Sequence, residues 1–504
     1  MTVAGALDQA GADELTPIDH YLAQQADLSP VERFVRRPAS DAVPVQARYH
    51  RALVPLTGPG PGQQYGFVVD LDACTGCKAC VTACHNLNGL DEGESYRTVG
   101  LLTGGTPAQP FQQTVTTACH HCVDPACLNG CPTNAYEKDV FNGIVAHIEG
   151  RCLGCGYCTW TCPYEVPRFN SARGVVRKCD MCHDRLAVGE APACVSACPN
   201  GAIRITLVDT AALSEAVRGE TLVPTAPPSG ITLPTTSYHS DWGLPDGLRA
   251  AGDTLGGHSH SHDPLVAMLV LTQASAGALA VDLAVGHQRA TAVTALGLAL
   301  VGLAISVLHL GRPERAWRAL AGWRHSWLSR EVGALGLFGG VAVLAVLTDS
   351  VVIQGVAALA GMAGVTCSGM LYVVTRRPSW RATVTLPRFA LGALVAGAAV
   401  SAATGGGRAA ALVLAGSLAA KLVWEGWVVW RFMPERPPLR GTGPVPAHGF
   451  ARFILGVSAV VLALTSTGGP AAGLALVAVL AGELIERSRF FTAASWTGMP
   501  GPKR

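Results

Sequence analysis

The stretch CLGCGYCTWTCP, residues 152–163, carries four cysteines in quick succession and ends in a proline. Three other stretches repeat this crowding: CTGCKACVTAC at 74–84, CHHCVDPACLNGCP at 119–132 and CDMCHDRLAVGEAPACVSACP at 179–199. The four groups hold all of the 17 cysteines except Cys367. Such tight spacing, repeated four times, indicates metal-binding thiolates rather than a framework of disulfides.

The run C-x2-C-x2-C-x3-C-P is a signature of bacterial ferredoxins, in which the fourth cysteine ligates the other iron–sulfur cluster of a pair. The proline after the last cysteine prevents a helix from continuing in the wrong direction. Structural zinc also uses C-x2-C pairs, but it has no role for a third cysteine two residues further on. The segments GFVVDLDAC (66–74) and FNGIVAHIEGRC (141–152) alternate in hydropathy and predict short strands of a ferredoxin-type fold.

The 504-residue chain has a cysteine-rich part followed by an apolar part. The grouped cysteines lie between Cys74 and Cys198, whereas long apolar runs begin only near Pro264. The formal net charge of +2 gives no support for nucleic-acid binding. The N-terminal residues lack a basic and an apolar region, so we do not expect a secretory signal there. Arg36-Arg37 is followed by a polar, proline-containing stretch, which does not fit a twin-arginine signal.

We expect four segments along the chain. Residues 1–64 form an N-terminal extension with one helix around 17–36, and residues 65–208 form the cluster domain. Residues 209–262 carry TAPPSG, LPTTS and HSHSH and predict a linker. The histidines in that segment, His258, His260 and His262, could bind a metal, but a solvated linker is the favoured interpretation. Residues 263–504 form the membrane anchor.

The C-terminal half contains repeated apolar stretches, and a helix needs about 20 apolar residues to cross a bilayer. The candidate spans lie near 264–285, 290–310, 328–348, 351–374, 386–404, 409–431, 450–467 and 470–491. The predicted fold is therefore an α+β ferredoxin-like iron–sulfur domain followed by an all-α eight-helix transmembrane bundle. Multi-pass insertion implies contact with membrane lipid.

The cysteine domain resembles the iron–sulfur subunit of dimethyl sulfoxide reductase-type molybdoenzymes across all four cysteine groups. The resemblance implies four ligand sets, which are Cys74, Cys77, Cys80 and Cys198 for the first cluster; Cys179, Cys182, Cys194 and Cys84 for the second; Cys119, Cys122, Cys127 and Cys162 for the third; and Cys152, Cys155, Cys158 and Cys131 for the fourth. Respiratory nitrate reductases have a tryptophan at the position of Cys155 and a three-iron cluster, so Cys155 implies four [4Fe–4S] clusters. The resemblance also places the first cluster nearest a catalytic subunit and the fourth nearest the quinol. The pattern departs at His85, where a proline is usual.

The membrane half resembles the dimethyl sulfoxide reductase membrane anchor in HLGRPERAW (309–317), LSREV (328–332) and LAGELIERSRFF (480–491). The resemblance implies eight spans, menaquinol binding and no haem. The histidine count agrees, because a b-type haem between helices normally needs two axial histidines. The predicted spans contain only His309, so we expect no haem.

His309 ends the second predicted span on the side of the cluster domain, where a neutral imidazole could accept a quinol proton. Arg312 and Glu331 fall at the same level and complete the proposed quinol site. The alternative to a quinol-site role is that His309 only extends its side chain to water at the membrane interface. Two pairs at helical spacing, Lys421/Glu425 and Glu483/Arg487, are interpreted as neutralised pairs that face the bundle interior.

Positive charges predict the orientation of the anchor. Loops on the side of the cluster domain hold most arginines of the membrane half, among them Arg312, Arg376 and Arg388, whereas the opposite loops hold Arg289 and Arg408. The positive-inside rule then places the iron–sulfur domain on the cytoplasmic face of a bacterial plasma (inner) membrane. This differs from the best-known relatives, whose catalytic arms face outward.

We therefore predict an electron-transfer and anchor subunit that oxidises menaquinol from the quinone pool. Electrons would pass through four [4Fe–4S] clusters to a separate molybdopterin-containing catalytic subunit that reduces an S-oxide, an N-oxide or an oxyanion. The main alternative is the reverse flow, from a dehydrogenase partner into the quinone pool. An ion-conducting module and a purely structural anchor without a quinol site are further alternatives.

Overall fold

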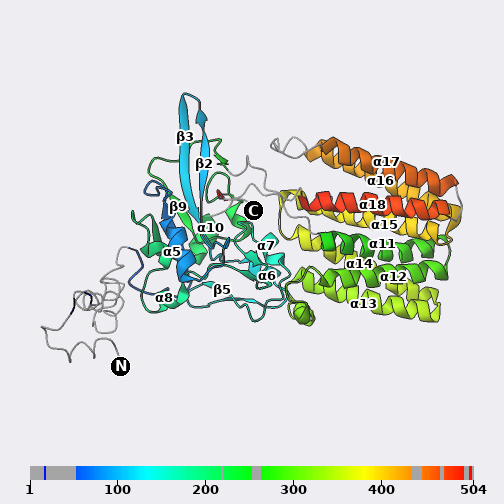
Figure 1. The fold of residues 1–504 in the computed structure, drawn as a ribbon, viewed down its shortest axis with the longest axis horizontal. Helices are drawn as coiled ribbons and strands as arrows, with labels where there is room; N and C mark the ends of the chain where they lie inside the picture. The colour runs from blue at the N-terminus through cyan, green and yellow to red at the C-terminus, as the bar shows by residue number, and fades with distance from the viewer. Residues whose placement is uncertain are drawn as a thin grey trace.

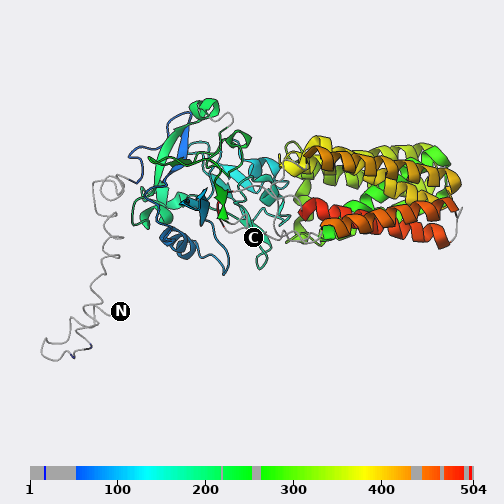
Figure 2. The same ribbon diagram turned by 90° about the horizontal axis from the view of Figure 1, so that it is seen from above.

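The computed structural model describes residues 53–216, 220–251, 263–432, 445–465, 470–492 and 499–501, together with Thr16 and Ile18. The predicted helix around 17–36 and the tract of His258, His260 and His262 lie outside the described residues. Two bodies are joined end to end, a cluster domain and a bundle of long helices that extend away from it (Figures 1 and 2).

The cluster domain is built from short elements. Its strands are β1 (Gln63–Asp70), β2 (Thr98–Thr106), β3 (Gln109–Thr117), β4 (Tyr136–Lys138), β5 (Val145–His147), β6 (Arg168–Asn170), β7 (Val175–Arg177), β8 (Ile203–Asp209), β9 (Ser237–His239) and β10 (Arg249–Ala250). Its helices are α5 (Ala79–Leu87), α6 (Ala126–Gly130), α7 (Tyr157–Thr161), α8 (His183–Ala187), α9 (Ala193–Ser196) and α10 (Thr210–Ala216), with a 3-10 turn η2 (Ser229–Ile231).

The two small sheets of this domain have the strand orders β8-β1-β9 and β10-β2-β3, and β4-β5 and β6-β7 form separate hairpins. The strands predicted before the first and third cysteine groups are present as β1 and β5. Part of the segment predicted as a linker, 209–262, instead adds strands to both sheets. β9 pairs with β1 and β10 pairs with β2, so backbone hydrogen bonding holds residues 237–250 against the domain.

Eight long helices follow within the described residues. They are α11 (Asp263–Val285), α12 (Arg289–Val307), α13 (Trp327–Thr348), α14 (Val351–Val373), α15 (Ala382–Ala403), α16 (Gly407–Phe432), α17 (Val445–Thr465) and α18 (Pro470–Thr492). Two short 3-10 segments, η4 (Pro313–Leu320) and η5 (Pro378–Trp380), lie in the connections at the cluster domain. α15 begins before the predicted residue 386 because the helix accommodates Pro387 within its second turn.

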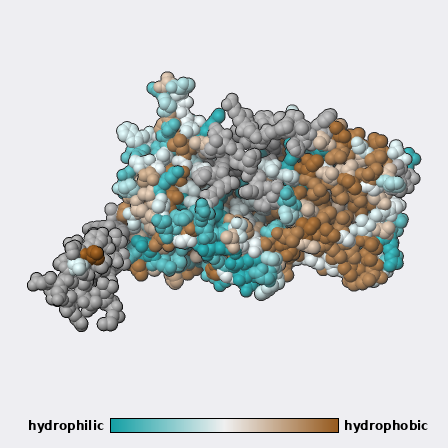
Figure 3. Space-filling view, viewed as in Figure 1, coloured by the Kyte–Doolittle hydropathy of each residue, from teal (hydrophilic) through white to brown (hydrophobic). Residues whose placement is uncertain are grey.

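Six of these helices, α11 to α16, are long and apolar enough to cross a membrane. Their outward surface is apolar and contrasts with the polar surface of the cluster domain (Figure 3). Large side chains such as Leu347, Val352 and Leu359 are exposed on it, as is usual for helices that face lipid. The protein is therefore integral to a membrane.

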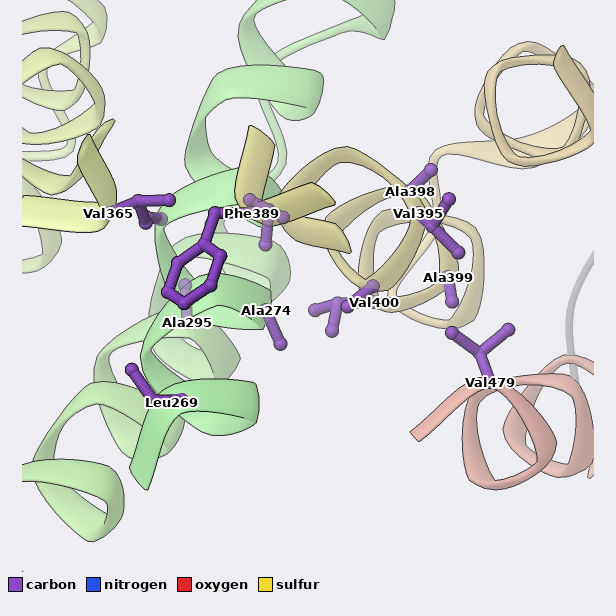
Figure 4. Packing of buried hydrophobic residues seen from close by; sticks show 14 of the residues in the cluster. Leu269, Ala274, Ala295, Val365, Phe389, Val395, Ala398, Ala399, Val400 and Val479 are labelled. Carbon is purple, nitrogen blue, oxygen red and sulfur yellow. The ribbon is translucent and has the colours of Figure 1, made fainter. Parts of the chain in front are cut away.

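The bundle core is made largely of small side chains. Ala274 on α11, Ala398 and Ala399 on α15 and Val479 on α18 are among the small side chains of this buried cluster (Figure 4). Small residues let helix backbones approach closely in lipid. The closest approach is between α11 and α15, where a Cβ on Gly277 would lie 1.8 Å from the carbonyl oxygen of Ala393.

The C-terminal residues 499–501 return to the cluster domain. Met499 is buried with Val69 and Leu102, and a Cβ on Gly100 would meet the backbone of Pro500. Residues 499–501 therefore lie on the same side of the bundle as the cluster domain.

Candidate iron–sulfur centres and quinol site

Two cavities in the cluster domain are each lined by four cysteines. One has about 320 Å³ of empty space and is lined by Cys74, Cys77, Cys80 and Cys198, with Pro199 beside the last. The other has about 370 Å³ and is lined by Cys119, Cys122, Cys127 and Cys162, with Pro163 beside the last. The structure therefore brings together residues from distant motifs in the same two sets that the resemblance implies for the first and third clusters.

The other two sets are packed closely as well. Burial, together with the nearby Cys194 and Cys182, raises the pKa of Cys84 to about 12. Burial likewise raises the pKa of Cys155 to about 12, and Cys131 and Cys152 lie near enough to add to this shift. A buried thiol of this kind is neutral until a metal displaces its proton, so binding of iron would release protons.

Backbone N–H groups donate to several cysteine sulfurs. Ala135 donates to Cys131 and Ala202 to Cys198, in both cases at 3.3 Å from nitrogen to sulfur. Each pair spans the same sequence pattern, because both cysteines precede a proline and the donor follows four residues later. Similar bonds join Met181 to Cys179 at 3.3 Å and Gly154 to Cys152 at 3.4 Å. Donors that point at sulfur favour the thiolate and are a feature of iron–sulfur sites.

These sulfurs surround cavities instead of converging on one point. Within the ranges that the structure describes, no three His, Cys, Asp or Glu side chains are placed to hold a single metal ion. A cluster of several irons needs its thiolates spread around it, so a cavity with four cysteines on its wall fits the group that the motifs predict.

The sets follow one another through the domain. Cys80 of the first set lies near Cys194 of the second, and Cys179 of the second lies near Cys119 of the third. Tyr136 lies beside cysteines of the third and fourth sets, Cys127 and Cys158. The order is therefore first, second, third and fourth.

The two ends of this series differ in their surroundings. Cys77 of the first set is exposed to solvent. Cys155 of the fourth set packs against the hydrophobic core of the helix bundle, together with Trp160. The series thus runs from an exposed surface of the cluster domain to the membrane half.

Backbone hydrogen bonds attach the loop of the fourth set to the segment HLGRPERAW. Gly311 donates to the carbonyl of Gly154 at 3.1 Å, and Arg312 donates to that of Leu153 at 3.0 Å. The Arg312 guanidinium also donates to the carbonyl of Glu149 at 2.9 Å. A Cβ on Gly311 would lie 2.2 Å from the carbonyl oxygen of Gly174, so only glycine permits this approach.

Aromatic side chains close the rest of the junction. Trp160, which precedes Cys162 by two residues, stacks on Phe491 with ring centroids 5.5 Å apart. Tyr157 donates its hydroxyl proton to the carbonyl of Leu371 at 2.6 Å. Arg377, buried directly before η5, donates to the carbonyl of Trp160 at 3.3 Å. Besides its backbone bonds, the stretch CLGCGYCTWTCP therefore contacts the bundle through its two aromatic residues, Tyr157 and Trp160.

The structure places the three predicted quinol-site residues in different surroundings. His309 lies just beyond the end of α12 and is half-buried. Arg312 lies against the fourth cysteine loop, as described above. Glu331 is buried on α13 and accepts a hydrogen bond from the hydroxyl of Ser368 on α14. Its charge acts on Tyr157, so Glu331 lies on the bundle side of the same junction.

The charged residues deeper in the bundle pair across helices, not along them as predicted. Lys421 on α16 binds Glu483 on α18, and Glu425 binds Arg452 on α17 at 2.8 Å. Arg487 donates to Gln273 on α11 at 2.8 Å. Spacing by four places two side chains on one helix face. In both predicted pairs, Lys421/Glu425 and Glu483/Arg487, the side chains instead bind partners on facing helices. These contacts tie α11, α16, α17 and α18 together.

Sequence reasoning missed the residues that form the junction. Ser368, Tyr157, Trp160 and Arg377 carry no motif of their own. The available signal was the two aromatic residues inside CLGCGYCTWTCP, since the other three cysteine groups contain none.

Sets of four cysteines around cavities, joined to apolar helices, define a membrane-anchored iron–sulfur protein that transfers electrons. Residues 111–207 match the family described as 4Fe-4S dicluster domain, and residues 258–409 match the DMSO reductase anchor subunit (DmsC). The protein belongs to the iron–sulfur subunit family of dimethyl sulfoxide reductases and carries a segment of the matching anchor family in the same polypeptide. The family assignment made from the sequence is thereby confirmed.

Individual relatives support this assignment. The sequence is 34% identical over 203 residues to the B subunit of anaerobic dimethyl sulfoxide reductase from Haemophilus influenzae, which covers 38% of this protein and 96% of that subunit. It is 41% identical over 149 residues to thiosulfate reductase electron transfer subunit PhsB of Salmonella typhi, covering 29% and 77%. It is also 34% identical over 188 residues to the nitrate-inducible formate dehydrogenase iron-sulfur subunit of Escherichia coli, covering 34% and 60%.

Substitution of Gly311 by alanine should loosen the junction. The added Cβ meets the backbone of Gly174, and overpacking of this kind typically costs about 1–3 kcal/mol. We expect the amides of residues 311 and 312 to exchange with deuterium roughly tenfold faster, measured by mass spectrometry on peptides that cover the segment. Gly150→Ala is the control, because a Cβ there meets nothing within 4 Å. Equal exchange in both variants would contradict the described contact.

Proposed function

We propose that this protein oxidises menaquinol at the membrane and delivers the electrons to a separate molybdopterin-containing subunit that reduces an S-oxide, an N-oxide or an oxyanion. The observation that carries the proposal is the placement of the two ends of the cysteine series. The fourth set lies against the bundle, and the first set has an exposed cysteine, Cys77. A series with one end in the membrane half and the other at a surface suits electron transfer between a lipid-soluble donor and a protein partner.

The sixteen grouped cysteines hold four [4Fe–4S] clusters in this proposal, in the four sets given above. When bound, the clusters supply one-electron carriers between the quinol and the partner. The polypeptide itself contributes the thiolates and the N–H donors to sulfur. It also contributes the walls of each cavity, which exclude water from all but the exposed end.

The quinol site in this proposal lies at the junction and uses His309, Arg312 and Glu331. Ionisable residues inside a membrane are rare and usually mark function. Glu331 is buried with a single described donor, the Ser368 hydroxyl, so its other carboxylate oxygen is available to accept a quinol proton. His309 lies at the end of α12, where a neutral imidazole can accept the second proton and pass it to water. Arg312 positions the cysteine loop through its contacts with Leu153 and Glu149.

The anchor crosses the membrane eight times in this proposal. α17 and α18 lie parallel to the six apolar helices, and both views of the ribbon agree on this (Figures 1 and 2). The charged residues Glu483, Glu486 and Arg487 of α18 are buried and have polar partners on other helices of the bundle, which permits this helix to span. An even number of spans also agrees with residues 499–501, which lie against the cluster domain.

The catalytic partner and the direction of flow are proposals drawn from the relatives. The B subunit of dimethyl sulfoxide reductase and the thiosulfate reductase electron transfer subunit are named for reductases, which favours electron flow out of the quinol pool. The similarity to a formate dehydrogenase subunit favours a second candidate function, delivery of electrons from a dehydrogenase partner into the quinone pool. A redox titration separates the two, because cluster potentials that are all well below that of menaquinol would favour quinone reduction.

The ligand assignment predicts about 16 iron atoms per polypeptide. Cys155→Ser should remove about one iron and give the oxidised-state electron paramagnetic resonance signal of a three-iron cluster. Cys367→Ser is the control, because Cys367 lies in α14 and belongs to none of the four sets. Iron loss in the control, or full iron content in Cys155→Ser, would refute the assignment.

Glu331→Gln should slow the oxidation of a menaquinol analogue by about 10²-fold, because it removes a proton acceptor and keeps the volume. The measurement is the rate of cluster reduction by the quinol in membranes, with iron content as a check on folding. Glu314→Gln is the matched control, since Glu314 lies in η4 with an exposed side chain. An unchanged rate in Glu331→Gln would show that Glu331 does not accept a quinol proton and would contradict the proposed site.

The positive-inside rule places the cluster domain and the C-terminus in the cytoplasm. A reporter enzyme that is active only outside the cytoplasm should therefore be silent when it is fused after Arg504, and active when it is inserted near Arg408 in the opposite loop. The reverse result would invert the proposed orientation.

A further inference from the structure

Lys178 is a fully enclosed cation between two cysteine sets. Its side chain is 5% exposed, and Nζ lies 3.7 Å from the sulfur of Cys119 in the third set. Nζ also donates to the carbonyl oxygen of Cys179 in the second set at 2.7 Å and to that of Val145. The thiols of Cys119, Cys127 and Cys179 and the carboxylate of Asp180 lie close enough to act on this cation.

Arg97 occupies the corresponding place between the first and second sets. It is 2% exposed, and its Nη1 donates to the Thr116 hydroxyl at 3.2 Å. That hydroxyl lies 3.6 Å from the sulfur of Cys80 in the first set. The thiols of Cys194 and Cys179 in the second set and the hydroxyl of Tyr238 also act on the guanidinium.

A buried cation needs a negative partner. Transfer of a charge into a low-dielectric interior is costly unless the charge is paired. Among the described residues, Nε and Nη2 of Arg97 have no hydrogen-bond partner. For both Arg97 and Lys178 the ionisable groups that act most strongly on the cation are cysteine thiols. Four thiolates around an iron–sulfur cluster would supply the missing negative charge.

We propose that Arg97 and Lys178 are fixed positive charges that raise the reduction potentials of the clusters on either side of them. Arg97 acts on the first and second clusters, and Lys178 acts on the second and third. The inference rests on the ligand sets given under Proposed function. Reduction adds one negative charge to a cluster, so a nearby cation stabilises the reduced form more than the oxidised form.

The competing role is purely structural, in which each cation only satisfies nearby hydrogen-bond acceptors. Lys138 offers a comparison, because its Nζ donates to the carbonyls of Cys122 at 3.2 Å and Val123 at 2.7 Å. Lys138 is only half-buried, so solvent screens its charge. A structural role predicts similar effects for Lys138 and Lys178, whereas an electrostatic role predicts a large effect for Lys178 alone.

The test is a redox titration of the full-length protein in detergent, followed by electron paramagnetic resonance of each cluster. The wild-type protein is measured first. Fewer than four clusters there would refute the ligand sets, a failure distinct from that of the present inference. With four clusters present, Lys178→Gln should lower the potentials of the second and third clusters. At a fixed ambient potential the reduced-to-oxidised ratio should fall at least tenfold, which is about 59 mV for a one-electron couple.

The pattern over the four clusters distinguishes charge from packing. Arg97→Gln should lower the potentials of the first and second clusters by a similar amount, and the fourth should be unchanged in both variants. Lys138→Gln should shift the third cluster less than tenfold. If Lys178→Gln loses its clusters, Lys178→Arg retains the charge and should keep all four at wild-type potentials. Unshifted potentials in both glutamine variants, an equal shift of all four clusters, or cluster loss in Lys178→Arg would overturn the inference.

Discussion

The contact among Gly154, Gly174 and Gly311 brings the cysteine-rich domain against the membrane half. A side chain on any of the three would meet the backbone of another, so the approach depends on glycine at each position. The backbone hydrogen bonds of Gly311 and Arg312 hold the same loop that carries Cys152 and Cys155. The position of the fourth cysteine set relative to the bundle therefore depends on this contact, and the proposed path from quinol to partner depends on that position.

Buried charged side chains have different kinds of partner in the membrane half and in the cluster domain. In the bundle, Lys421, Glu425 and Arg487 find polar partners on facing helices, which makes these residues compatible with lipid and ties the helices together. In the cluster domain, Arg97 and Lys178 are buried among thiols. The same physical cost of burial thus leads to structural pairing in one half and to a proposed electronic role in the other.

Much of this arrangement could be predicted from the sequence because its signals are local. Cysteine spacing predicted the four groups, and apolar runs predicted the positions of the long helices to within a few residues. Contacts between distant segments carry no such signal. The strand β9, which pairs with β1, lies in a polar stretch whose composition predicted a linker. Glu425 pairs with Arg452 on another helix and not with Lys421 on its own helix. The assignment of Glu331 to a quinol site stays a prediction, and no signal in the sequence identified its hydrogen-bond donor, Ser368, which lies on a separate helix and carries no motif.

In the proposed function, electrons pass between the membrane and a separate molybdopterin-containing partner at the exposed end of the cysteine series. The most direct test is to purify the full-length protein from membranes in mild detergent, identify the proteins that accompany it and assay molybdenum in the same sample. We expect the purified sample to contain a molybdopterin-containing subunit in stoichiometric amount, together with molybdenum. A preparation that retains its iron and its quinol-dependent reduction but contains a different partner and no molybdenum would contradict it.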